Sequence, residues 1–247
     1  MESIVIYDSK PILNAPIFIE CLPGIGNVGK SAGEFLAESL GAKRFATIYS
    51  QHFPSQVLLD EDNIVELMNN QLWYANDING KDLLFLIGDC QCTTHEGQFV
   101  FCKDVLNILL EYNISEMITL GGYGTGLMVE KPRVFGAVTD LKIKKEFADL
   151  GVEFPPGDPA AGIIGASGVF LGLGRIYGLS AICLMGETSG YFIDHKSAMA
   201  LVEIIMKKLG VELDLKDLIE KSGHIDELTA KVKALESHNK QDLGYIG

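Results

Sequence analysis

Apolar and polar residues follow one another along the chain in blocks that predict strands and helices in turn. The chain has 247 residues. The predicted strands are Ile4–Tyr7, Pro16–Leu22, Phe45–Tyr49, Leu83–Asp89, Glu116–Leu120, Val134–Thr139 and Leu179–Met185. The predicted helices are Lys30–Leu40, Glu96–Tyr112, Lys142–Leu150, Gly162–Tyr177, His195–Leu209 and Leu215–Leu235. This alternation predicts an α/β protein with a parallel or mixed sheet that helices cover on both faces.

Three shorter apolar runs lie between the predicted strands Phe45–Tyr49 and Leu83–Asp89, at Gln56–Leu59, Ile64–Met68 and Leu72–Tyr74. Polar turn residues separate them, which favours an antiparallel insertion or sheet edge. The last predicted helix is interrupted near Gly223. We expect a core domain over residues 1–210, and a helical segment with a flexible tail over residues 211–247.

The predicted helix Gly162–Tyr177 is rich in glycine, with Gly165, Gly168, Gly172 and Gly174 inside it. Each glycine in a helix costs up to about 1 kcal/mol relative to alanine. Such a helix forms where neighbouring segments approach closely. The pattern indicates a buried packing helix or a contact between subunits.

A glycine-rich loop, Gly24–Ser31, follows the second strand and fits two phosphate-binding templates. As a P-loop it would hold phosphates on backbone N–H groups, with Lys30 reaching them and Ser31 binding Mg²⁺. As a dinucleotide fingerprint it needs a carboxylate about 20 residues further on. The strand ending at Tyr49 is followed by Ser, Gln and His, so the dinucleotide reading fails. Asp89 ends an apolar strand and could serve the P-loop as a metal ligand.

The same design of a strand followed by a glycine-rich segment recurs three times, at residues 120–126, 162–174 and 185–190. Glycines spread over several strand ends favour close backbone packing over one phosphate clamp. The P-loop reading therefore stays an alternative to a packing role for Gly24, Gly26 and Gly29.

Loops that follow parallel strands meet at one carboxyl edge of the sheet, where we expect a candidate pocket. Its residues are Gly24, Gly26, Gly29, Asp89, Gln91, Glu96, Gln98, Tyr123, Thr125, Glu187, Thr188 and Ser189. Glu96 and Glu187 could form an acid/base pair if they faced each other. In the alternative, Glu96 belongs to a helix capping box with Thr93 or Thr94.

Composition narrows the class of protein. Apolar residues make up 47% of the chain and the mean hydropathy is +0.21, which predicts a large core and buried contacts between identical subunits. The net charge is -13, and the arginines number three, Arg44, Arg133 and Arg175. Because nucleic acids are bound through Lys and Arg at phosphates, this balance argues against a nucleic-acid partner.

Several features predict a cytoplasmic protein without a membrane partner. The longest apolar run, Ala160 to Gly174, is shorter than a membrane span. The N-terminal residues Met1 to Ser3 are acidic, which is not typical of a signal peptide. Five cysteines, an odd number, favour a reducing compartment over a disulfide framework.

Four potential zinc ligands lie close together in the sequence, Cys90, Cys92, His95 and Cys102. Their spacing is not that of a standard zinc finger. Buried free thiols are common core residues, so we expect no metal site here.

The chain ends in an apolar group after a polar stretch. Ser237 to Gln241 is wholly polar, and Leu243, Tyr245, Ile246 and Gly247 follow. Apolar residues at the end of a polar segment need a surface to dock on. Partner capture is one reading, and folding back onto the same subunit is the other.

Several of these segments together resemble the archaeal branch of the proteasome assembly chaperone family, the relatives of eukaryotic proteasome assembly chaperone two. The resemblance covers roughly Ile4 to Ala234. It implies a three-layer α/β/α sandwich like that of nucleoside phosphorylases, a homo-oligomer, and no enzymatic activity or cofactor. The segments that carry it are residues 22–29, 88–91, 96–98, 120–126, 132–137 and 186–190.

The resemblance also implies a partner. Relatives act on the proteasome core particle by inserting a C-terminal hydrophobic–Tyr–any tripeptide into pockets of its α-ring. This chain ends in Tyr245, Ile246 and Gly247, with tyrosine at the hydrophobic position. We expect an oligomer that engages the α-ring through its tail and aids assembly or activation without ATP. The alternatives are a hydrolase or transferase acting on nucleosides or phosphate esters, and a P-loop NTPase.

Overall fold

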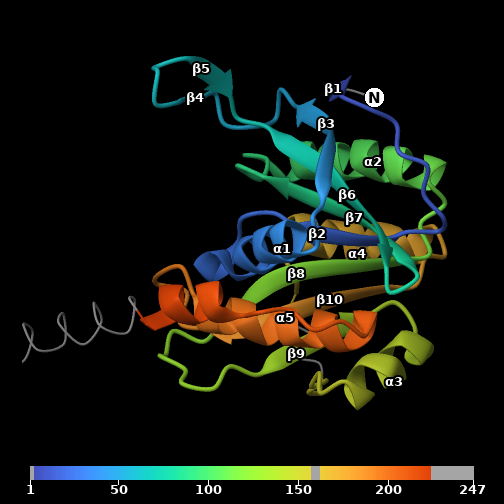
Figure 1. Ribbon diagram of the computed structural model, residues 1–247, viewed down its shortest axis with the longest axis vertical. Coiled ribbons are helices and arrows are strands. Elements are labelled where there is room, and N and C mark those ends of the chain that lie inside the picture. Colours follow the sequence, from blue (N-terminus) through green and yellow to red (C-terminus); the bar gives the residue numbers. More distant parts are fainter. Residues whose placement is uncertain (1–2, 157–161, 224–247) are drawn as a thin grey trace, which may run out of the picture.

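The computed structural model describes residues 3–156 and 162–223, in which a mixed eight-stranded sheet runs through the centre (Figure 1). Its strand order is β1-β3-β6-β7-β2-β8-β10-β9. The strands are β1 (Ile4–Tyr7), β2 (Ile17–Cys21), β3 (Lys43–Tyr49), β6 (Asn70–Ile78), β7 (Lys81–Gly88), β8 (Glu116–Gly124), β9 (Val134–Val138) and β10 (Ala181–Thr188). The helices are α1 (Val28–Ser39), α2 (His95–Glu111), α3 (Leu141–Asp149), α4 (Ala166–Ile176) and α5 (His195–Leu209), and a 3-10 turn, η1 (Ile25–Asn27), precedes α1.

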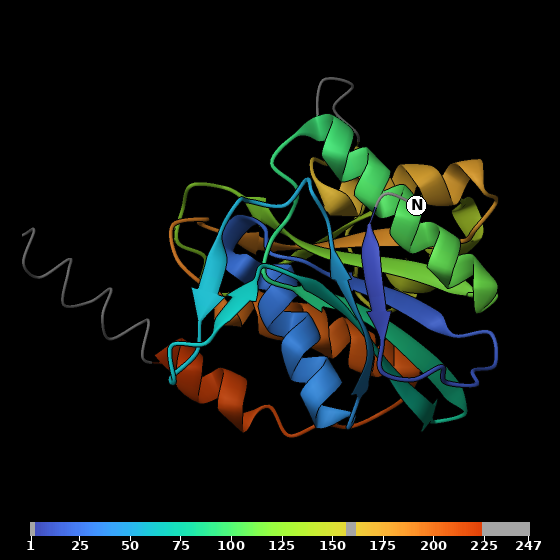
Figure 2. The ribbon, with the colours of Figure 1, turned by 90° about the horizontal axis from the view of Figure 1, so that it is seen from above.

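The sheet is parallel in its centre and antiparallel at both sides. β2 pairs in parallel with β7 and β8, and β8 pairs in parallel with β10. β1, β3 and β6 extend one side antiparallel, and β9 closes the other. Helices α1 and α5 contact each other over one face, and α2 and α4 over the other (Figure 2). The predicted mixed sheet and its three layers are confirmed.

Strand β2 shows how the sequence divides the core. Successive side chains of a strand point to opposite faces. Ile17, Ile19 and Cys21 join the buried cluster under α1 and α5, whereas Phe18 and Leu22 join the cluster under α2 and α4. All five residues of β2 are buried, as expected for a central parallel strand.

Two of the three predicted short runs form a separate hairpin of β4 (Val57–Leu59) and β5 (Val65–Leu67), which projects from the body next to the end of β3 (Figure 1). The third run, Leu72–Tyr74, belongs to β6 of the main sheet. The hairpin is anchored at Asn69, whose backbone N–H donates to Asp89 Oδ2 at 3.0 Å. The base of the hairpin is thus held by a hydrogen bond to the main body, and the hairpin exposes apolar side chains.

The predicted boundaries move where glycine changes the backbone. Helix α4 begins at Ala166, four residues later than predicted, because Gly165 has φ of 86° and lies outside the helix. Residues 216–223 are helical and Leu218 is buried in the core. The remainder of the predicted helix Leu215–Leu235 lies outside the described residues, so the division at residue 210 stays a prediction. Across residues 3–156 and 162–223, no helix has the length and apolar character needed to span a bilayer.

Candidate functional site

The carboxyl ends of β7, β2, β8 and β10 share one edge of the sheet, as expected for parallel neighbours. A groove of about 540 Å³ opens there between η1 and the start of α4. Three of the candidate residues line it, Gly24, Gln91 and Tyr123. The sequence prediction therefore located the edge and part of its lining.

Gln91 joins the two sides of this groove. Its Nε2 donates to the carbonyl of Pro23 at 2.7 Å, and its Oε1 accepts from the backbone N–H of Ala166 at 2.9 Å. Gly165 has φ of 86°, which favours glycine, and a Cβ there would lie 2.5 Å from Gln91 Oε1. Gln91 is a fixed part of the wall, with both amide atoms occupied.

Sequence reasoning missed two residues here, Ser167, which lines the groove, and Glu20, which is buried beneath it. Glu20 is fully buried on β2, and its Oε2 accepts from Ser167 Oγ at 2.7 Å. Its Oε1 accepts from the backbone N–H of Leu22 at 3.0 Å. Burial raises the pKa of Glu20 to about 7, although both hydrogen bonds act to lower it. The only signal in the sequence was a carboxylate inside an apolar strand.

The Gly24–Ser31 loop is built for packing. Gly26 has φ of 61°, and Asn27, with φ of 48°, is the N-cap of α1. Gly29 lies directly against β8, where a Cβ would be 2.1 Å from the carbonyl oxygen of Leu120. Lys30 Nζ donates to the carbonyl of Gly88 at 3.0 Å. The lysine that a P-loop would aim at phosphate instead binds a neighbouring strand.

Asp89 and Gln98 also have partners within the protein. Asp89 accepts from the backbone of Asn69 and lines a different cavity of about 520 Å³, next to Lys30. Gln98 Oε1 accepts from the backbone N–H of Cys92 at 2.9 Å. These two candidates do not line the groove that holds Gly24 and Tyr123.

Glu96 lies in the first turn of α2, one position before the one that the predicted capping box requires. The N-cap is Thr94, whose hydroxyl accepts from the backbone N–H of Gly97 at 3.1 Å. The capping-box position is therefore occupied by Gly97, and Glu96 precedes it. A carboxylate in a first turn interacts favourably with the helix dipole.

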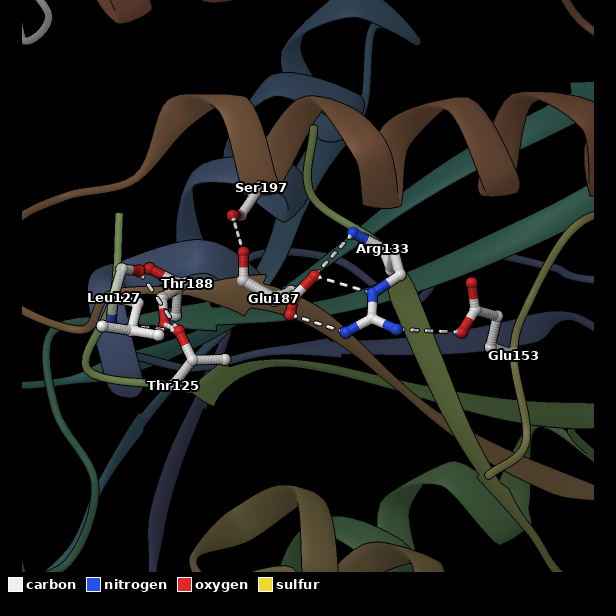
Figure 3. Close-up of polar contacts among 7 residues, drawn as sticks. All are labelled: Thr125, Leu127, Arg133, Glu153, Glu187, Thr188 and Ser197. Carbon is white, nitrogen blue, oxygen red and sulfur yellow. Dashed lines mark hydrogen bonds and ion pairs between the residues drawn. The ribbon is translucent and has the colours of Figure 1, made fainter. Parts of the chain in front are cut away.

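Glu187 forms a two-point ion pair with Arg133 (Figure 3). Its Oε1 accepts from Nη2 at 2.9 Å and its Oε2 from Nε at 3.0 Å. The hydrogen bond from Arg133 holds the pKa of Glu187 below its ordinary value. Arg133 also lies 3.6 Å from Glu153, and Ser197 Oγ donates to the backbone carbonyl of Glu187. Glu187 is thus an ionised anchor bound to Arg133.

A second set of contacts ties three loops together at this edge. Thr125 Oγ1 donates to the carbonyl of Thr188 at 3.1 Å (Figure 3). Thr188 Oγ1 donates to Asp194 Oδ2 at 2.7 Å, and Ser189 is buried beside it. The backbone N–H of Asp194 donates to the carbonyl of Gly26 at 2.9 Å. These predicted site residues fix the loops after β8 and β10 to η1.

We expect Glu187→Gln to loosen the loop after β8. The amide keeps the shape but loses the charge that binds Arg133 at two points. Amide hydrogen exchange over residues 125–132 should speed up roughly tenfold at pH 7. Because the pKa of Glu187 is lowered in the fold, its stabilisation is present above the ordinary carboxyl pKa and is lost as pH falls through the lowered value. The difference between wild type and variant should therefore shrink in acid. Equal exchange at pH 7 would contradict an anchoring role.

The four potential zinc ligands, Cys90, Cys92, His95 and Cys102, do not form a metal site. Over the described residues, no three His, Cys, Asp or Glu side chains come together as a metal site. Burial raises the pKa of Cys90 to about 11 and of Cys92 to about 12, which keeps both thiols protonated. Zinc binds the thiolate form.

The predicted tail residues Leu243, Tyr245, Ile246 and Gly247 lie outside the described residues.

Comparison with known proteins gives four findings. Residues 18–233 match the model of the PAC2 family. PbaB from Pyrococcus furiosus, an archaeal proteasome activator, is 37% identical, with a TM-score of 0.89 over 94% of this chain and 99% of that one. PbaA from the same organism, an archaeal homolog of proteasome-assembly chaperone, is 25% identical, with a TM-score of 0.76 over 96% and 99%. The uncharacterized protein MJ1210 of Methanocaldococcus jannaschii is 31% identical over 97% of this chain and 95% of that protein.

Proposed function

The chain belongs to the PAC2 family, and we propose that it is an oligomeric, ATP-independent protein that binds the α-ring of the proteasome core particle. It would aid assembly or activation of that particle. The observation that carries this proposal is the similarity to PbaB, an archaeal proteasome activator, at 37% identity over 94% of the chain.

We propose the C-terminal tail as the point of contact. Leu243, Tyr245, Ile246 and Gly247 are apolar or small and follow the polar stretch from Ser237 to Gln241. An oligomer presents several tails at once, so weak single contacts add through a high effective concentration. The protein would act in the cytoplasm, where its thiols stay reduced.

The function is binding and not catalysis. Three of the polar residues that the enzyme alternatives would use have partners within the protein: Lys30 with Gly88, Gln91 with both walls of the groove, and Glu187 with Arg133. Gly24, Gln91 and Tyr123 line the open groove, and we propose them as its contact surface for a small ligand.

We expect purified core particle to retain the intact chain in a pulldown, and a chain lacking Tyr245 to Gly247 to be retained at least about tenfold less, the loss expected when about 1.4 kcal/mol of binding is removed. Replacement of Asn239, Lys240 and Gln241 by alanine is the matched control and should keep binding, because it leaves the apolar residues in place. Equal retention of the shortened chain would reject the tail as the contact. Failure of the intact chain to bind would reject the proposed function.

A further inference from the structure

The β4–β5 hairpin carries an apolar face that nothing in the described structure covers. Its register pairs Val57 with Leu67 and Leu59 with Val65. Directly opposed residues share a face, and so do residues two apart on one strand. Val57, Leu59, Val65 and Leu67 therefore form one apolar surface, and Leu59 and Val65 are both 63% exposed. We call these four residues the hairpin face.

The tip beside this face is acidic. Asp60, Glu61 and Asp62 are consecutive and exposed, and residues 45–80 contain no lysine or arginine. Asp60 Oδ1 accepts from the backbone N–H groups of Asp62 and Ile64, which fixes the turn. A two-stranded hairpin has little stability of its own and gains it by packing against another surface. Its neighbour should be apolar at the centre and cationic at the rim.

A surface of that description exists on this same chain. Leu141 is 82% exposed at the start of α3, and Ile176 is 75% exposed at the end of α4, next to Tyr177. The two elements are joined there, because Arg175 Nη1 donates to the carbonyl of Thr139 at 3.1 Å. Lysine and arginine side chains border Leu141, Ile176 and Tyr177, and we therefore call the surface of these three residues the cationic patch.

Three positive side chains border the cationic patch. Lys103 Nζ lies 4.7 Å from the centre of the Tyr177 ring, and Lys142 and Arg175, each next in sequence to an apolar residue of the patch, are exposed. Asp140, which directly precedes α3, accepts from Ser180 and from two backbone N–H groups at the start of that helix. The long stems of lysine and arginine extend the apolar area, while their charges stay at the edge.

The hairpin and the cationic patch lie at opposite ends of the molecule. Figure 1 places β4 and β5 at one end of the longest axis and α3 at the other, and the turned view in Figure 2 keeps the hairpin and α4 on opposite sides. The two surfaces therefore cannot meet within one chain. They can meet between two chains.

We infer that the hairpin face of one copy docks on the cationic patch of the next copy, so that the chain assembles head to tail. Apolar side chains meet at the centre, and the acidic tip meets Lys103, Lys142 and Arg175. A head-to-tail contact uses two different surfaces and closes into a ring when the rotation allows. In such a ring every copy has the same orientation, so all tails leave on the same side. The inference rests on the oligomer of the proposed function and supplies its interface.

Two single-surface variants test the contact by light scattering after gel filtration. The hairpin variant is Glu61→Lys with Val65→Asp, and the patch variant is Lys142→Glu with Ile176→Asp. Both leave Asp60 and Arg175 in place, so the turn and the link to Thr139 persist. Each variant should lose the wild-type assembly and run as a monomer of 26.9 kDa. Ile12→Asp, at an exposed apolar position elsewhere that is 94% exposed, is the matched control and should keep the assembly.

Mixing the two variants separates this contact from every symmetric one. The hairpin variant keeps an intact patch and the patch variant keeps an intact hairpin, so an equal mixture has one working interface and should form a heterodimer. A wild-type monomer, a single variant that keeps the wild-type mass, or a mixture that stays monomeric would overturn the inference. Circular dichroism confirms that the variants are folded. Pulldown by core particle is scored separately, so loss of assembly and loss of proteasome binding are distinguishable.

Discussion

Replacing Gly29 by alanine is expected to destabilise the folded protein by about 3 kcal/mol or more, at the upper end of overpacking effects. Gly29 lies in the first turn of α1 where the helix crosses β8. An added Cβ would lie 2.1 Å from the carbonyl oxygen of Leu120 and 2.6 Å from its carbonyl carbon. Both atoms belong to the backbone of a central strand. They cannot rotate away as a flexible side chain would, so the whole helix would have to shift.

Urea unfolding at pH 7 measures this effect, with Gly172→Ala as the control. Gly172 is in α4, and a Cβ there would have no neighbour within 4 Å. Because both substitutions put alanine in a helix, both gain the same intrinsic propensity of about 1 kcal/mol. Gly172→Ala should therefore be neutral or stabilising, and the difference between the variants reports the packing at β8. Wild-type stability of Gly29→Ala would contradict the close approach of α1 to the sheet.

The glycine-rich loop shows why a local motif does not decide a function. The eight residues from Gly24 fit a P-loop as written, and no property of those residues alone separates a phosphate cradle from a packing contact. The packing role becomes evident only from the contacts of Gly29 with Leu120 and of Lys30 with Gly88, and both partners lie far away in the sequence. The recurrence of glycine at other strand ends was the one signal that favoured packing.

The fold was predictable because its signals are local. Apolar runs such as Leu83–Asp89 and the helical period of His195–Leu209 are short-range patterns, and the structure has a strand and a helix there. The start of α4 was predicted four residues early, because the sequence does not reveal that Gly165 adopts a left-handed φ. The ends of helices and strands depend on backbone φ and ψ angles. A single residue favours certain angles but does not determine them.

The candidate site was predictable only in part, because it depends on contacts between distant segments. The topology of parallel strands placed Gly24, Gln91 and Tyr123 at one edge. The partner of Glu187 was not visible, since Arg133 is 54 residues away. The partner of Glu20 was not visible either, since Ser167 is 147 residues away.

The second large expected effect is a change in how the free energy of unfolding depends on pH when Glu20 is replaced. Burial raises the pKa of this carboxyl from 4.5 to about 7 in the folded protein. The folded state therefore holds the proton more tightly than the unfolded state does. The stabilisation from protonated Glu20 is fully present below about pH 4.5, is lost as pH rises to about 7, and changes no further above that. The corresponding free energy is about 3 kcal/mol.

Glu20→Gln removes the titration and keeps the shape. The amide oxygen can still accept from the backbone N–H of Leu22, and the amide N–H₂ can donate to Ser167 Oγ, which then turns its proton toward the carbonyl of Leu120, 3.5 Å away. The variant should match wild type near pH 4.5 and exceed it by about 3 kcal/mol at pH 8, because it has no buried charge to form. Measuring urea unfolding from pH 4.5 to 8 and subtracting the two curves cancels all other titrating groups.

Ser167→Ala should change the pH dependence of stability in the opposite direction to Glu20→Gln. The hydroxyl of Ser167 lowers the pKa of Glu20 by donating to its charged form, so its removal raises the pKa further. The free energy of unfolding should then fall more steeply with pH than in wild type, and continue to fall above pH 7. Parallel curves for wild type and Glu20→Gln would show that this carboxyl is not buried as β2 and α4 place it. Opposite changes in slope for the two variants would locate the proton on Glu20.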